Sequence, residues 1–137
     1  MRVLVTGATG FVGSGVVREL ASRGHAVRAL VRARSNLRNL EGVEVERVVG
    51  DVLDAPSVAR AVEGCGGLVH AAGVTDLAGG DQRMREVNVR GVEIALDAAL
   101  RAGVRRAVVT SSTAVMGGSL QPEVADEATP LRGAEQG

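Results

Sequence analysis

Short apolar runs alternate along this chain with longer stretches in which apolar residues recur at helical spacing. Runs rich in β-branched residues predict five strands, at residues 2–6, 26–31, 43–49, 68–72 and 106–110. The helical pattern predicts three helices, at about 11–23, 55–62 and 87–100, each followed by a glycine that can end it. Residues 32–42 are polar, and we expect a loop there with at most a short helix.

Near-continuous apolar strands separated by helices are typical of parallel strands that are buried on both faces. Right-handed crossovers then predict an α/β fold, a doubly wound parallel sheet in the order 3-2-1-4-5. In such sheets ligands bind beyond the carboxyl ends of the strands, at the switch point between strands one and four. The loops that begin at Gly7, Arg32, Asp51, Ala71 and Ser111 all fall on that edge.

The turn after the first strand is rich in glycine and leads into a helix. Gly7 permits a tight turn, Gly10 lets a pyrophosphate approach the backbone, and Gly13 lets the helix lie close to the strand. An anion placed there meets free N–H groups at the positive end of the helix. The spacing is G-x-x-G-x-x-G, not the G-x-G-x-x-G of the usual dinucleotide fingerprint, and an ordinary glycine-rich turn is the alternative interpretation.

The composition excludes several other classes of protein. The 137-residue chain carries 16 basic and 16 acidic residues, so its charge indicates neither a nucleic-acid partner nor an anionic membrane. One cysteine, Cys65, excludes an internal disulfide and fits a reducing compartment. We expect no signal peptide before the first strand, and no apolar run approaches the roughly 20 residues of a membrane span. We expect a soluble cytoplasmic protein without a metal site.

Several stretches together resemble a known family, the extended short-chain dehydrogenase/reductases or NAD(P)-dependent epimerase/dehydratase family. The matching pieces occur in order along the chain: TGATGFVG (6–13), GDV (50–52), VHAAG (69–73), NVRG (88–91), VTSSTAV (109–115) and DEATP (126–130). The resemblance covers the whole chain and implies a Rossmann-like core at 1–112, followed at 113–137 by the start of a catalytic and substrate segment.

The resemblance also implies a dinucleotide site, residue by residue. The turn would hold the pyrophosphate through Gly7, Thr9, Gly10, Phe11, Val12 and Gly13. Asp51 would accept a hydrogen bond from the adenine amine and Val52 would meet the ring through its backbone, although Asp51 also suits a simple turn. Further contacts would come from His70, Ala71, Ala72, Gly73, Asn88, Thr110 and Ser111. We expect His70 to pack at a strand end without acid–base work, and Asn88 either to brace the strand-four loop or to face solvent.

The end of the second strand bears on the choice of cofactor. Enzymes that prefer NAD usually place a carboxylate there for the ribose 2′-hydroxyl, whereas arginine accepts a 2′-phosphate. Here Arg32 follows the strand, Arg34 and Ser35 come next, and no carboxylate occurs before Glu41. We therefore predict NADP rather than NAD, with a solvated basic loop as the alternative.

The catalytic residues of the family are incomplete in this chain. Ser112 matches the serine or threonine that binds the substrate oxygen, with Ser111 a close competitor and Thr113 a distant one. The tyrosine and lysine of the family's Tyr-x-x-x-Lys are missing, because the chain has no Tyr and all 16 basic residues are Arg. We interpret the chain as stopping before the catalytic helix. Strand five would then be an unpaired edge beside a bare sheet face, which favours self-association.

Three hypotheses follow from these residues. The chain is the cofactor half of an NADP-dependent reductase or a nucleotide-sugar epimerase or dehydratase, inactive as it stands; or a dinucleotide-binding sensor without turnover; or a remnant that binds nothing well. The substrate stays open among a sugar nucleotide, a hydroxysteroid-like alcohol and a flavonoid-type ketone. The arginine after strand two leans towards a reductase.

Overall fold

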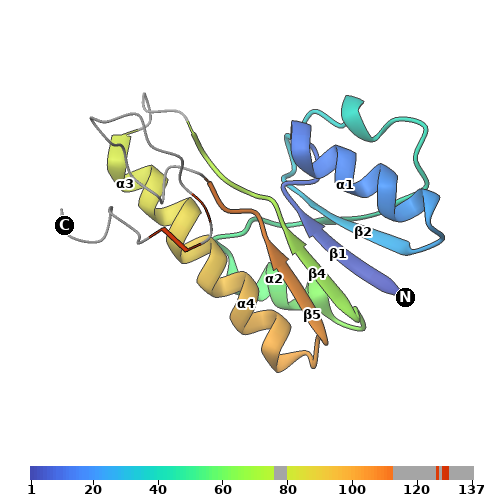
Figure 1. The fold of residues 1–137 in the computed structure, drawn as a ribbon. Coiled ribbons are helices and arrows are strands. Elements are labelled where there is room, and N and C mark those ends of the chain that lie inside the picture. The colour runs from blue at the N-terminus through green and yellow to red at the C-terminus, as the bar shows by residue number, and fades with distance from the viewer. Residues whose placement is uncertain (76–79, 113–125, 127, 130–137) are drawn as a thin grey trace.

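The computed structural model describes residues 1–75, 80–112, 126, 128 and 129. These residues form a five-stranded parallel sheet in the order β3-β2-β1-β4-β5, which confirms the predicted fold class (Figure 1). The strands are β1 (Arg2–Thr6), β2 (Ala26–Val31), β3 (Glu46–Val49), β4 (Gly67–His70) and β5 (Arg106–Val109). The helices are α1 (Phe11–Ser22), η1 (Arg38–Leu40), α2 (Ala55–Val62), α3 (Gly80–Arg85), the π-helix η3 (Glu86–Arg90) and α4 (Gly91–Arg101).

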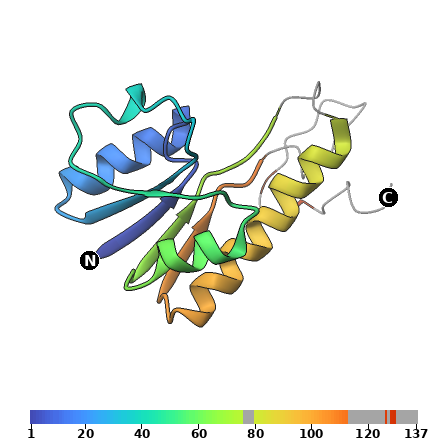
Figure 2. The same ribbon diagram turned by 180° about the vertical axis from the view of Figure 1, so that it is seen from behind.

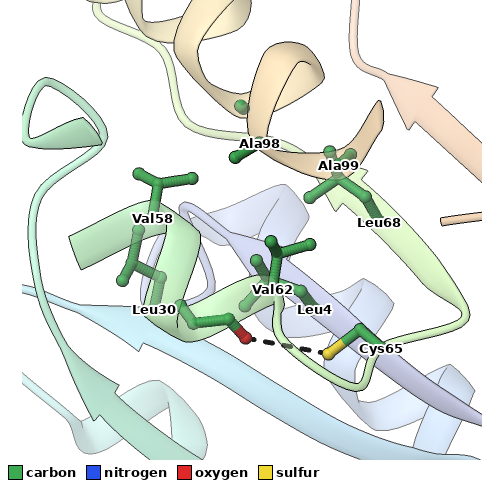
Figure 3. Close-up of a cluster of buried hydrophobic side chains, with 10 residues drawn as sticks. Leu4, Leu30, Val58, Val62, Cys65, Leu68, Ala98 and Ala99 are labelled. Carbon is green, nitrogen blue, oxygen red and sulfur yellow. Dashed lines mark hydrogen bonds between the residues drawn. The ribbon is translucent and has the colours of Figure 1, made fainter. Parts of the chain in front are cut away.

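Each face of the sheet has its own hydrophobic cluster. On one face α2 and α4 cover residues that include Leu4 and Leu68 of the central strands, with Val62 of α2 packed among them (Figures 2 and 3). On the other face α1 covers Val5 and Ala29 (Figure 1). The central strands are therefore buried on both sides, as their near-continuous apolar sequence predicts.

Small residues make the contact between α4 and the sheet. Gly91, Ala95, Ala98 and Ala99 are buried, whereas Leu100 is 79% exposed. A Cβ on Gly91 would lie 3.3 Å from Cγ2 of Val52, so the start of the helix also passes close to the loop after β3. The alanine face lets α4 and α2 approach each other over β1 and β4, and it fixes the position of the residues N-terminal to α4.

Three strands are shorter than predicted, and the fifth ends at Val109 rather than residue 110. The third begins at Glu46 rather than residue 43, because its pairing with β2 starts at Arg28 opposite Glu46. Val43 and Val45 pack against the hydrophobic cluster between α1 and the sheet but do not pair with β2. This packing accounts for the alternation of apolar and polar residues there. The fourth strand ends at His70 rather than residue 72, since β1 ends opposite it at Thr6 and supplies no further ladder partner.

The third predicted helix is also different in detail. The structure has α3, then five residues of π-helix, then α4, in place of one regular helix over 87–100. A π-helix widens the backbone by one residue per turn, and such segments are frequent at functional sites. Side-chain periodicity cannot reveal it, because the apolar spacing changes very little over five residues.

Arg28 lies in the middle of β2 and is 9% exposed. Its Nη1 donates to the carbonyl oxygens of Ala61 and Glu63, both at 2.8 Å, and its Nη2 lies 3.0 Å from Oε1 of Glu46. The guanidinium thus satisfies carbonyls at the C-terminal end of α2, which the helix itself leaves without partners. This explains the single charged residue in an otherwise apolar strand.

Within the described part of the chain, no helix has the length and apolar character needed to cross a membrane.

Candidate functional site

The glycine turn is packed against the loop that follows β4. Gly7 has a φ of +65°, and a Cβ there would lie 2.5 Å from the carbonyl carbon of Ala71. The amide of Gly10 donates to the Gly7 carbonyl at 3.0 Å, which closes the turn before α1 begins. A Cβ on Gly13 would overlap the same carbonyl. Backbone therefore meets backbone at this point, and no larger residue fits at Gly7 or Gly13 without displacement.

The last residues of β1 and β4 are joined by a buried side-chain hydrogen bond. The hydroxyl of Thr6 lies 3.0 Å from Nδ1 of His70, and both residues are 1% exposed or less. The amide of Ala72 donates to the same hydroxyl at 3.4 Å. Burial lowers the pKa of His70, so the imidazole is neutral at pH 7.

A cavity of about 280 Å³ opens at the carboxyl ends of the strands, where the loops after β1, β2, β3 and β4 meet α3 and η3. Ten of the predicted site residues line it: Gly7, Thr9, Gly10, Arg32, Ser35, Asp51, Val52, Ala71, Ala72 and Gly73. The structure therefore brings together, in one cavity, segments that the sequence separates by up to about 65 residues. This is the switch point of the sheet, where open α/β folds bind their ligands.

Arg32 and Ser35 form a tight turn at the end of β2. The Arg32 amide donates to the Ser35 hydroxyl at 3.1 Å, and the Ser35 amide donates to the Arg32 carbonyl at 2.9 Å. Both residues line the cavity, whereas Arg34 between them does not. The turn thus places one arginine of this segment, and not both, against the cavity.

Asp51 is held by a buried serine that the sequence analysis did not single out. The hydroxyl of Ser57 accepts the Asp51 amide at 3.1 Å and also lies 2.9 Å from the carbonyl oxygen of Asp54. Oδ1 of Asp51 accepts the Leu53 amide at 3.0 Å. Asp54 is the N-cap residue of α2, but its side chain makes no capping hydrogen bond. Ser57, the third residue of the helix, instead ties the start of α2 to the Asp51 loop.

Asn88 lies in the π-helix and forms two hydrogen bonds with the loop after β4. Its Nδ2 donates to the Val74 carbonyl and its Oδ1 accepts the Val74 amide, both at 2.8 Å. This pair of hydrogen bonds resembles the pairing of two strands, and it holds Val74, which lines the cavity. Asn88 itself is outside the set of residues that line the cavity.

The structure leaves other predicted site residues outside the cavity. Phe11 is 94% exposed at the start of α1, with Val12 beside it, and Gly13 is buried beneath the turn. Ser111 and Ser112 follow β5 and are exposed. The full set outside the cavity is Phe11, Val12, Gly13, Arg34, His70, Asn88, Thr110, Ser111 and Ser112. Thr113 and most of the predicted 113–137 segment lie outside the described residues.

Seven further residues line the cavity that the sequence analysis did not assign: Leu30, Gly50, Leu53, Val74, Arg83, Glu86 and Val87. Arg83 comes from α3 and Glu86 from η3, so both helices contribute side chains to the cavity. Asn39 was missed as well: its Nδ2 donates to the Thr9 carbonyl at 2.8 Å and so ties η1 to the glycine turn. No sequence motif marks these residues, because their role depends on contacts between distant segments.

Comparison with known families gives a match over nearly the whole chain. Residues 4–136 match the model of the 3-beta hydroxysteroid dehydrogenase/isomerase family. Among curated proteins, the chain is 45% identical over 118 residues to sterol demethylase protein B of Methylococcus capsulatus. It is 43% identical over 136 residues to 3 beta-hydroxysteroid dehydrogenase/Delta 5-->4-isomerase of Mycobacterium tuberculosis. These matches cover 85% and 94% of the chain, but only 36% of each relative.

Solved structures show the same fold. A short-chain dehydrogenase/reductase superfamily protein of Agrobacterium tumefaciens with bound NAD is 37% identical, with a TM-score of 0.78. UDP-glucose 4-epimerase of Thermus thermophilus in complex with NAD is 31% identical, with a TM-score of 0.81. Each match covers 96% of this chain, and 39% and 44% of the respective structures. The chain thus spans less than half the length of these relatives.

Proposed function

Because the chain belongs to the 3-beta hydroxysteroid dehydrogenase/isomerase family, we propose that it forms the dinucleotide-binding part of an NAD(P)-dependent dehydrogenase or reductase. The observation that carries this proposal is the cavity at the switch point of the sheet, bounded by the glycine turn, Arg32 and Asp51. Its volume of about 280 Å³ is near the lower end of small-molecule sites.

Residues at both ends of the cavity suit the binding of one dinucleotide. Gly7 and Gly10 bring backbone up to the N-terminal end of α1, where the first N–H groups have no intrahelical acceptor and favour a pyrophosphate. Asp51 and Val52 would hold the adenine, and Ala71 to Gly73 would lie beside the pyrophosphate and the adjoining ribose. The nicotinamide of a bound cofactor supplies hydride transfer; the protein supplies its position.

Phe11, Val12 and Gly13 contribute to this proposal through their backbone. They form the first turn of α1, so their amides can face an anion although their side chains lie outside the cavity. Thr110 and Ser111 continue from β5 at the same edge of the sheet, on the side where the nicotinamide end of a cofactor would emerge. Their contact with the cofactor belongs to the proposal.

We propose NADP as the preferred cofactor, with NAD as the alternative. Arg32 lines the cavity directly after β2, and the Ser35 turn fixes its backbone. A guanidinium at this position forms charge-assisted hydrogen bonds to a 2′-phosphate, which NAD lacks.

Catalysis requires groups that this sequence does not contain. Ser112 would bind the substrate oxygen, but the chain has no Tyr and no Lys to transfer and tune a proton. We therefore propose that the 137-residue chain binds cofactor without turnover. The names of its relatives favour a sterol-type alcohol as the substrate of an enzyme that contains this part. A non-catalytic dinucleotide sensor is the second candidate.

Titration of the purified chain with NADPH and with NADH tests the proposal. We expect saturable binding of both, followed by cofactor fluorescence, a rise in melting temperature on binding, and tighter binding of NADPH. Absence of binding by either cofactor would overturn the proposed function. Binding of NADH with equal or greater affinity would leave the site standing and refute the NADP preference.

The Arg32→Asp variant tests the basis of that preference. We expect the ratio of NADPH to NADH affinity to fall by about tenfold to a hundredfold, because a charge-assisted hydrogen bond is lost and a carboxylate faces the 2′-phosphate. Arg34→Asp is the matched control, since it makes the same charge change two residues away at a position outside the cavity. An equal effect of both variants would indicate a general charge effect rather than a contact.

A further inference from the structure

Two backbone contacts and one bond to a side chain hold the loop after β4 against the end of β1 and the glycine turn. The Ala71 amide donates to the Thr6 carbonyl at 3.2 Å, the Ala72 amide donates to the Thr6 hydroxyl at 3.4 Å, and Gly7 lies in direct backbone contact with Ala71. The regular ladder ends one residue earlier, at Thr6 opposite His70. The side chain of Thr6 therefore replaces the ladder at the point where the two strands part.

The 3.4 Å bond from Ala72 is long, so it depends on where the Thr6 hydroxyl is held. His70 holds it: its Nδ1 lies 3.0 Å from Oγ1 of Thr6, across a sequence separation of 64 residues. Both side chains are buried on the α2 and α4 side of the sheet and neither lines the cavity. Both side chains are therefore set back from the cavity.

The second nitrogen of His70 makes this arrangement costly. Within the described part of the chain its Nε2 is buried and has no hydrogen-bond partner. An unsatisfied buried polar atom destabilises a fold, whereas a leucine would fill similar space without that penalty. The bond from Nδ1 to Thr6 is what the imidazole provides and a hydrocarbon side chain cannot.

We propose that Thr6 and His70 are positioning residues, which hold the 71–73 loop at a set distance from the glycine turn and so fix the crevice for the pyrophosphate of the cofactor. This inference rests on the proposed dinucleotide site. It differs from a direct contact of His70 with the cofactor, because the imidazole acts through the Thr6 hydroxyl and the Ala72 amide.

Two pairs of variants separate the hydrogen bond from the space that the side chains fill. Thr6→Val removes the hydroxyl and keeps the branched shape, whereas Thr6→Ser keeps the hydroxyl. His70→Leu removes the imidazole, whereas His70→Asn keeps a polar atom near the position of Nδ1. Val62→Ala is the control for general destabilisation, because Val62 is buried in the α2 cluster away from the cavity.

Binding is measured with NADPH and with adenosine 2′-monophosphate, which lacks the pyrophosphate. We expect Thr6→Val and His70→Leu to weaken NADPH binding by about fivefold and to leave binding of the monophosphate unchanged. Thr6→Ser and His70→Asn should bind NADPH like the unmodified chain. Equal loss for both ligands, or the same selective loss in Val62→Ala, would overturn the inference.

Amide hydrogen exchange without ligand tests the same joint independently of binding. Thr6→Val and His70→Leu should raise the exchange rate of the Ala72 amide well above that in Val62→Ala at matched stability. If the unmodified chain binds neither ligand, the proposed function fails, and this exchange experiment still decides whether the pair holds the loop. If Thr6→Val or His70→Leu does not fold, the other of these two variants gives the exchange rate of the Ala72 amide. An unchanged Ala72 amide in a folded variant would refute the positioning role.

Discussion

At the scale of single residues, the glycines of the first βα unit differ by what lies next to them. A Cβ on Gly13 would overlap the carbonyl of Gly7, whereas a Cβ on Gly15, one half-turn along α1, would meet nothing within 4 Å. The sequence presents both as helical glycines in the same stretch. Because α1 lies so close to the turn, Gly13 leaves no room for a side chain. Gly15 has that room and only lowers the stability of the helix.

We expect Gly13→Ala and Gly15→Ala to change stability in opposite directions. Gly13→Ala should destabilise the fold by about 1–3 kcal/mol, because helix and turn must separate to admit the methyl group. Gly15→Ala should stabilise it by about 0.5–1 kcal/mol, because alanine loses less backbone entropy in a helix. Denaturant unfolding of the two variants measures both changes. A Gly13→Ala variant as stable as Gly15→Ala would contradict the packing described here.

At the scale of elements, a charge network between the buried Arg28 and the exposed Glu46 joins β2, β3 and α2. Arg28 of β2 reaches the last carbonyls of α2 and pairs with Glu46 of β3. The hydrogen bond from Arg28 holds the pKa of the Glu46 carboxyl below its ordinary value of 4.5, although burial opposes the shift. Removal of the carboxylate would leave a nearly buried guanidinium with less compensation, and such a loss is more damaging than loss of a surface pair.

Glu46→Gln should therefore lower the melting temperature in a pH-dependent way. A carboxyl whose pKa is lowered by folding stabilises the native state above its unfolded-state pKa, and this stabilisation disappears as pH falls through the folded-state pKa. The difference in melting temperature between the variant and the unmodified chain should thus be largest at pH 7 and shrink below about pH 4.5. Glu44→Gln, at an exposed position two residues earlier, is the control. A difference that is independent of pH would show that the ion pair is not its source.

At the scale of the molecule, the sheet ends on an exposed strand. In the described part of the chain β5 pairs with β4 alone, and all four of its residues are exposed. Val108 is 58% exposed and lies beside Val69. It is on the face of the sheet that α1 packs against, but α1 covers the other strands and not β5 (Figure 1). An open backbone edge next to an apolar face is a surface that favours pairing with another chain.

We expect the purified chain to self-associate in a concentration-dependent manner through this edge. Val108→Glu should shift it towards the monomer, because a charge on the exposed face opposes strand pairing and apolar contact. Leu100→Glu adds the same charge at an exposed site on α4, over the opposite face, and should have little effect. Sedimentation velocity over a wide range of concentrations measures both. A monodisperse monomer at every concentration would refute the prediction.

Much of the fold was accessible from local patterning. The strand runs, the glycines after each helix and the right-handed crossover rule together predicted the order 3-2-1-4-5, and the structure confirms it. The bounds of β1 and β2 agree with the prediction, because apolar runs and turn residues coincide there. The bounds of the other three strands differ from the prediction, since a strand ends where its partner ends, and the partner lies elsewhere in the sequence.

The candidate site, too, could be predicted from the sequence only in part. The glycine turn and the segments around Arg32, Asp51 and Ala71 could be identified from residue type and spacing, because a strand followed by a tight turn is a local pattern. Which side chains line the cavity could not be, since Arg32 and Arg34 look alike until the Ser35 turn orients them.

Contacts between distant segments account for the remainder. The bond between Thr6 and His70 joins residues 64 apart, and the one from Asn88 to Val74 depends on a π-helix that side-chain spacing does not encode. Local chemistry decides which elements form and in what order they pack. Packing over long separations decides where each strand ends, which polar groups are buried together, and which side chains reach the cavity.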